Sequence, residues 1–272
     1  MILQVNHKTI YSYDRPLQQS IQVIRLTPFN HHRQRVISWG IDAPNKMSQA
    51  IDWFGNQSSF LNLSNGEREV CIVAHGLVEV YPASVNPVLG ILDATYYLRS
   101  TSLSLINASL VELAESCRVN YPVILSGTDK LSLLFELSAK ILQHVPYTRG
   151  VTNSATTAIA AYSIKGGVCQ DHSHIFLACC RYLGIPARYV SGYLYTNDAA
   201  HLASHAWAEA WIDSSWCSFD ISNQCPAGET HIELAYGLDY LDACPIRGSR
   251  IGGGTESIDA VSYVTAAVPP QI

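Results

Sequence analysis

The hydrophobic pattern changes its period twice along this 272-residue chain, and that change constrains the fold most strongly. Residues 1–82 carry short β-rich or alternating runs, which are typical of strands with one buried face. Residues 105–183 carry apolar residues at helical spacing, and strand-like runs return after residue 186. We therefore expect an α+β protein that begins with a small antiparallel β-sandwich. The expected strands are Leu3–Tyr13, Ile21–Leu26, Val36–Ile41, Val70–Val80, Ala187–Tyr195, Ala206–Ile212, Trp216–Asp220 and Ile258–Val268.

An irregular stretch with Pro82, Pro87 and Gly90 separates the first β-rich part from the helical part. Proline and glycine at this density predict a linker. We place an N-terminal β-rich domain at 1–90 and a catalytic core at 91–272. The strands after about residue 230 either complete that core or return to pack against the N-terminal domain.

Composition narrows the function classes. The net charge is −5, and only 14% of residues are charged, against roughly 25% in an average soluble protein. The absence of a basic stripe argues against a nucleic-acid partner, and no polybasic anchor for a membrane surface is present. The first residues lack a signal-peptide pattern and no long apolar run occurs, so we expect a cytoplasmic protein. The eight cysteines include no CxxC pair, and we expect reduced thiols and no metal or cofactor.

Cys169 follows two glycines and opens the helix expected at Cys169–Leu183. The first N–H groups of a helix are unpaired and carry partial positive charge, which favours the nucleophilic thiolate. The same N–H groups could bind the oxyanion of a tetrahedral intermediate. Taken alone, a cysteine in this position also fits a small buried residue.

His205 and Asp220 lie on two expected strands joined at Asp213-Ser214-Ser215. In a hairpin, the start of one strand faces the end of the next, so the two side chains can be neighbours. The imidazole would take the thiol proton, and the carboxylate would orient the imidazole. Separately, a core histidine and a strand-end aspartate explain these residues equally well.

Four segments together resemble the transglutaminase-like superfamily core. They are Gly166-Gly-Val-Cys-Gln-Asp-His-Ser-His, Leu183-Gly-Ile-Pro-Ala-Arg-Tyr-Val-Ser-Gly-Tyr, Ser204-His-Ala-Trp-Ala-Glu and Phe219-Asp. More narrowly, the chain is similar to bacterial transglutaminase-like cysteine proteases with an N-terminal β-rich region. That similarity rests on Val5–Tyr13, Ile24-Arg-Leu-Thr-Pro, Asp52-Trp-Phe-Gly-Asn and the segment from His231 to Gly248.

The resemblance implies a papain-like α+β fold, with the cysteine helix packed on an antiparallel sheet. It also implies that Cys169 is the nucleophile, His205 the base and Asp220 the orienting acid. Two positions depart from the family pattern. His172 stands where an aromatic residue is common, and Asn223 follows Ile221-Ser222 where Pro-Thr-Asn is frequent.

Further residues are candidates for the surroundings of the site. Asp171, His172, His174 and His201 suggest a metal site, but only Asp171 and His174 share a helix face, so we prefer bracing roles for that pair. Trp207, Trp211 and Trp216 alternate along the expected hairpin, and core packing is the preferred interpretation, although one of them could line the acyl groove. We expect the oxyanion hole or cleft to include Gly167, Val168, Gln170 and Trp207, and the supporting residues to include Asp171, His174, Ser204, Asp239 and Tyr240.

The preferred interpretation is a cysteine hydrolase that cleaves a peptide or amide bond through a thioester. A transglutaminase-type acyltransferase would use the same three residues and pass the acyl group to an amine. An inactive peptide-binding module with this fold is the third possibility. The sequence does not define the substrate or the oligomeric state.

Overall fold

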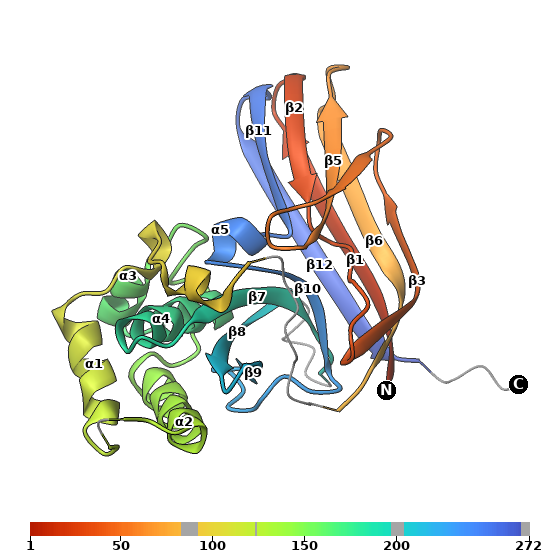
Figure 1. The fold of residues 1–272 in the computed structure, drawn as a ribbon. Helices are drawn as coiled ribbons and strands as arrows, with labels where there is room; N and C mark the ends of the chain where they lie inside the picture. Colours follow the sequence, from red (N-terminus) through yellow and green to blue (C-terminus); the bar gives the residue numbers. More distant parts are fainter. Residues whose placement is uncertain (83–91, 123, 197–203, 268–272) are drawn as a thin grey trace, which may run out of the picture.

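The computed structural model describes residues 1–82, 92–122, 124–196 and 204–267. Three antiparallel four-stranded sheets and a group of helices make up the fold. Figure 1 shows the helices on one side of the molecule, two sheets on the other side, and the third sheet between them. The chain is therefore a mixed α+β protein, as the change of hydrophobic period predicts.

Two of the sheets form the β-sandwich. One has the strand order β12-β1-β6-β3 and the other has the order β11-β2-β5-β4. Their inward side chains form one cluster that includes Leu3, Leu17 and Leu61. The strands are β1 (Ile2–Tyr13), β2 (Leu17–Ile24), β3 (Gln34–Asp42), β4 (Ser48–Ile51), β5 (Gln57–Leu63), β6 (Glu69–Val80), β11 (Ile246–Gly252) and β12 (Glu256–Ala266).

Both ends of the chain contribute to this sandwich. β12 pairs with β1 from Leu3↔Ala266 to Tyr13↔Glu256. β11 pairs with β2 in the second sheet. The strands after residue 245 thus lie with the first 80 residues in space, although the whole helical part separates them in sequence.

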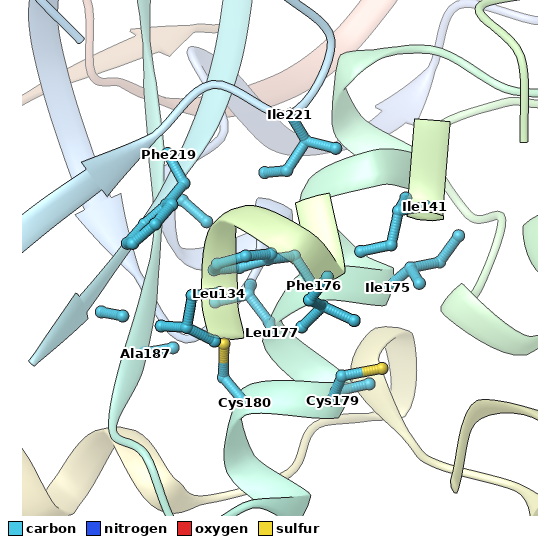
Figure 2. Close-up of a cluster of buried hydrophobic side chains, with 14 of the residues drawn as sticks. Leu134, Ile141, Ile175, Phe176, Leu177, Cys179, Cys180, Ala187, Phe219 and Ile221 are labelled. Atoms are coloured by element: carbon cyan, nitrogen blue, oxygen red, sulfur yellow. The ribbon is translucent and has the colours of Figure 1, made fainter. Parts of the chain in front are cut away.

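The third sheet carries the order β10-β7-β8-β9. One face is covered by helices, and the cluster between them includes Phe176 and Phe219, whose ring centroids lie 5.1 Å apart (Figure 2). Its strands are β7 (Ala187–Leu194), β8 (His205–Ile212), β9 (Ser215–Phe219) and β10 (His231–Gly237). The helices are α1 (Ala108–Arg118), α2 (Gly127–His144), α3 (Ala158–Ile164), α4 (Cys169–Tyr182) and α5 (Tyr240–Ala243), with 3-10 turns η1 (Ala94–Leu98) and η2 (Ser102–Ser104).

Helix α4 is the central helix of this layer. Every residue from Asp171 to Arg181 is buried, because the helix packs against the sheet on one side and against α1, α2 and α3 on the other. A helix buried all round has a fixed position. Its first residue, Cys169, is therefore held in place by the core.

The other face of the third sheet packs on the sandwich. Tyr193, Ile232 and Leu234 of that sheet belong to the same apolar cluster as the sandwich core. The described part of the chain contains no helix with the length and apolar character needed to cross a bilayer.

Candidate active site

Cys169 is the first residue of α4 and is half-buried, with Val168 as the N-cap residue. The first N–H groups of a helix have no acceptor within the helix. They lie beside the thiol and give this end of α4 a partial positive charge. One turn of backbone thus places a thiol beside N–H groups that have no acceptor within the helix.

The backbone before Cys169 is fixed by hydrogen bonds. The Thr148 N–H donates to the Gly167 carbonyl at 2.7 Å. The Val168 N–H and the Thr152 hydroxyl both donate to Asp171 Oδ2, at 2.8 and 2.7 Å. A Cβ on Gly167 would lie 2.7 Å from Asp171 Oδ2, so glycine is needed there for the close approach of Asp171. Asp171 therefore braces the start of the cysteine helix.

His205 is the first residue of β8, and Asp220 directly follows β9. His205 Nε2 lies 2.7 Å from Asp220 Oδ2, and both side chains are buried. Nε2 is thus engaged with the carboxylate, and Cys169 lies close enough to His205 to influence the charge of the imidazole. The structure thus pairs His205 with Asp220 and places Cys169 near His205.

Burial and charge act in opposite directions on His205. Burial alone lowers the pKa of the imidazole, but the charge of Asp220, its hydrogen bond and the contact with Cys169 outweigh burial and raise the pKa to about 10. Burial alone raises the pKa of the Asp220 carboxyl, but His205 and His231 hold it well below its usual range. At neutral pH the pair is an imidazolium beside a carboxylate.

Two residues that were not among the predicted site residues also contact Asp220. His231 Nε2 lies 3.0 Å from Asp220 Oδ2. Asn223 donates to both carboxylate oxygens, through its backbone N–H at 3.1 Å and its Nδ2 at 2.7 Å. Asn223 stands out in the sequence only as a departure from the family pattern. His231 begins the C-terminal segment that carries part of the family resemblance, but nothing in that segment indicates its contact with Asp220, which arises from the tertiary fold.

The predicted cleft residues differ in their positions. Gln170 Nε2 donates to the Ser154 carbonyl at 3.2 Å and remains partly exposed beside Cys169. Trp207 is fully buried, and its ring lies edge-on to His231 at 5.3 Å. Trp207 is therefore packed in the interior and does not line an open groove.

The remaining supporting residues gather around α5. The Tyr240 N–H donates to His174 Nε2 at 3.2 Å, which connects α5 to the cysteine helix. Asp239 caps α5 by accepting from the Leu241 N–H at 2.7 Å. Ser204 and Tyr240 line a cavity of about 190 Å³ together with residues of β1, β11 and β12 of the sandwich.

The alternative of a metal site at Asp171, His172 and His174 is not supported by their contacts, since each of these side chains has other partners. His172 joins Ser222 Oγ at 2.8 Å and the Val145 carbonyl at 2.7 Å, whereas Asp171 and His174 have the separate partners given above. His201 lies outside the described residues.

A different group of three possible metal ligands is present. Ligand atoms of His205, Asp220 and His231 lie within 4.8 Å of one another. Both imidazole Nε2 atoms contact the same carboxylate oxygen. The donor atoms that a metal would need are thus engaged with each other, so the arrangement is better suited to orienting His205 than to binding an ion.

Two family profiles match different parts of the chain. The profile of the transglutaminase-like superfamily matches residues 118–221, which include Cys169, His205 and Asp220. The profile of the bacterial transglutaminase-like N-terminal region matches residues 3–79, which cover the sandwich strands β1 to β6.

Relatives of nearly the same length are found in mycobacteria. An uncharacterized protein of Mycobacterium leprae is 27% identical over 281 residues, covering 97% of this chain and 98% of the relative. One of Mycobacterium tuberculosis is 28% identical over 285 residues, covering 95% and 90%. The crystal structure of a "putative cysteine protease" from Cytophaga hutchinsonii has a TM-score of 0.77 at 19% identity, covering 100% of this chain and 92% of that one. At this identity, the likeness concerns the fold.

Proposed function

Because the chain belongs to the transglutaminase-like superfamily, we propose that it is a thiol hydrolase of peptide or amide bonds. The observation that carries this proposal is the 2.7 Å contact between His205 Nε2 and Asp220 Oδ2, in a site where Cys169 also acts on the His205 imidazole. In a Cys-His-Asp arrangement the acid orients the base and stabilises its charged form. That charged form in turn stabilises the thiolate.

The first half-reaction forms a thioester. Cys169 Sγ bonds to the substrate carbonyl carbon, and the carbonyl oxygen becomes an oxyanion. The helix N–H groups beside Cys169 are the donors available for this oxyanion. The imidazolium of His205 then gives its proton to the amide nitrogen as the carbon–nitrogen bond breaks, and the amine leaves.

The second half-reaction releases the acyl group. His205, now neutral, takes a proton from the acceptor, whose oxygen or nitrogen bonds to the thioester carbon. The carbon–sulfur bond breaks and returns Cys169 to the thiolate. Water as acceptor makes the protein a peptidase or amidase, and an amine would make it an acyltransferase.

Selective alkylation tests the activated thiol. We expect iodoacetamide to modify Cys169 much faster than the other seven cysteines at neutral pH. Burial raises the pKa of six of the others, namely Cys117, Cys179, Cys180, Cys217, Cys225 and Cys244. Similar modification rates at all eight positions, read by mass spectrometry of tryptic peptides, would contradict the proposal.

The identity of the acceptor needs a second experiment. The full chain is incubated with a peptide library, with and without an excess of a primary amine, and C169A is the control. We expect cleaved peptides with free carboxyl groups in both reactions. Amine-bearing products would assign an acyltransferase, and the absence of any Cys169-dependent product would favour a binding module.

A further inference from the structure

The Asp220 carboxylate is held from two sides by two histidines. His205 and His231 both direct Nε2 at Oδ2, at 2.7 and 3.0 Å. The Gly228 N–H donates to His231 Nδ1 at 3.2 Å, so Nδ1 is an acceptor and the ring proton lies on Nε2. His231 is therefore a neutral donor to Asp220, whereas His205 is the base.

The third sheet is shaped so that these side chains can meet. His231 begins β10 and His205 begins β8, with β7 between them in the sheet. Gly192 of β7 pairs directly with His205, and a Cβ on Gly192 would lie 2.7 Å from the Trp207 ring. The missing side chain lets Trp207 cross β7 and lie edge-on to His231.

The N-terminal sandwich fixes the strand that carries His231. Gln34, the first residue of β3, donates Nε2 to the Glu233 carbonyl at 2.9 Å and accepts from the Glu233 N–H at 2.8 Å. Arg33 donates to the Ala227 carbonyl at 3.2 Å and forms an ion pair with the Glu233 carboxylate. These contacts hold both sides of His231, and Arg33 and Gln34 are both buried.

We propose that His231 is a positioning residue for Asp220, and that Arg33 and Gln34 of the sandwich set its place. This inference rests on the proposed function, since Asp220 matters only if His205 is the base. It gives the N-terminal region a role in the chemistry: the sandwich orients the acid of the triad through β10. The charged and titratable groups facing His231 are Asp220, His205 and Arg33.

The test compares two substitutions that differ in one donor. H231L removes the hydrogen bond to Asp220, whereas H231Q can keep an N–H donor at a similar reach. We expect H231L to lower the rate of Cys169 alkylation by iodoacetamide by about 10- to 100-fold, because misplaced catalytic groups lose that much. H231Q should restore most of the rate. Equal rates in H231L and the unmodified chain would overturn the proposal.

A direct readout separates positioning from general damage. The downfield proton NMR signal of the His205 Nε2–H reports its bond to Asp220. We expect the signal to be lost or broadened in H231L and kept in H231Q, while denaturant unfolding shows both variants folded. A sharp, unshifted signal in a folded H231L would refute the positioning role even if the protein has no hydrolase activity.

The role of the sandwich is tested by coupling. Q34M keeps the length of the side chain and removes both hydrogen bonds to Glu233. If Gln34 acts through His231, Q34M lowers the alkylation rate alone but adds little to H231L. Q19M, on the exposed side of β2, is the matched control and should leave the rate unchanged. If the fall in alkylation rate in the double variant Q34M/H231L equals the product of the two single falls, Gln34 does not act through His231. An unchanged alkylation rate in Q34M would also contradict the link.

If Cys169 in the unmodified chain reacts no faster than the other cysteines, the proposed function fails. The NMR comparison of H231L with H231Q still decides the contact with Asp220. The two failures are therefore distinguishable.

Discussion

Arg188 Nε donates to Glu209 Oε2 at 2.7 Å, and the two residues are direct cross-strand partners on β7 and β8. Both are almost fully buried, at 1% and 0% exposure. The guanidinium also lies between the rings of Trp216 and Tyr236, at 4.3 and 3.9 Å from their centroids. Although burial alone raises the pKa of Glu209, Arg188 and Arg33 hold it below its usual value. The third sheet thus contains a fully enclosed ion pair.

Removing one member of this pair should destabilise the protein strongly. We expect R188M to lower the free energy of unfolding by about 3–5 kcal/mol, because the buried Glu209 carboxylate loses its 2.7 Å partner and keeps only the longer 3.4 Å contact with Arg33. R188M/E209L should lose less free energy of unfolding than R188M, since both charges of the pair are removed together. Urea unfolding measures both, and R35M, at an exposed pair with Glu79, serves as the control with a much smaller effect. A double variant as unstable as R188M would argue against the charge explanation.

The pH dependence of the proposed activity should reveal the His205–Asp220 pair. His205 must be protonated to give its proton to the leaving amine, and its pKa is about 10. The alkaline limb of kcat/KM should therefore lie near pH 10. D220N removes the charge that raises this pKa, so the limb should move to lower pH by more than about one unit, together with a large loss of rate. An alkaline limb that stays in place in D220N would show that another group sets it.

Acid should weaken the contact between the sandwich and the third sheet. His7 bonds Tyr193 Oη at 2.7 Å across that contact, and burial lowers the pKa of His7 to about 4. The unfolded chain takes up this proton near pH 6.5, whereas the folded chain resists it. The stabilisation is thus complete above pH 6.5 and is lost as the pH falls towards 4.

Between pH 6.5 and pH 4, the titration of His7 lowers the free energy of unfolding by at most about 1.4 kcal/mol per pH unit. H7Q should reduce the difference in urea midpoint between pH 7 and pH 5, and H75Q, at a half-exposed histidine, should not. Identical pH dependence in H7Q and the unmodified chain would disprove the assignment.

Asp171 should link the order of the cysteine helix to thiol reactivity. It accepts from the Val168 N–H and the Thr152 hydroxyl at the start of α4. D171A should cost about 1–2 kcal/mol, as the loss of a helix cap does, and should slow alkylation of Cys169. S126A removes the comparable cap of α2 and should destabilise the protein without slowing alkylation. Equal alkylation rates in D171A and S126A would show that Asp171 does not influence the reactivity of Cys169.

Alternation and helical spacing were sufficient to predict the long elements. β1 was expected at Leu3–Tyr13 and is found at Ile2–Tyr13, since every second residue is buried. Strands after about residue 230 are expected from the sequence, but their bounds are not. β10 has no visible bounds because all seven of its residues are buried and show no alternation. The bounds of β11 are hidden for the opposite reason, since its sequence Ile-Arg-Gly-Ser-Arg-Ile-Gly is polar and it is a strand because it pairs with β2.

The residues of the site also fall into those that local sequence patterns predict and those that depend on tertiary contacts. The position of Cys169 at a helix start is predictable because a helix start leaves a local sequence signal, and the contact between His205 and Asp220 is predictable because a hairpin joins their strands. His231 and the Arg33–Gln34 pair were not found, because their contacts with the site span strands that are distant in sequence. Trp207 was considered for the groove but is fully buried. A local sequence pattern cannot tell whether a strand residue such as Trp207 is buried or lines a groove, since burial depends on what packs against the strand.

The closure of the sandwich by β11 and β12 has a consequence for synthesis on the ribosome. Until these strands emerge, β1 and β2 each present one open edge, because their partners are made last. More than half of the chain lies between β6 and β12, which takes roughly ten seconds or more at about 5–20 residues per second. Open strand edges recruit other chains. The nascent protein therefore depends on rapid completion, or on a chaperone covering those edges, in a way that the finished fold does not.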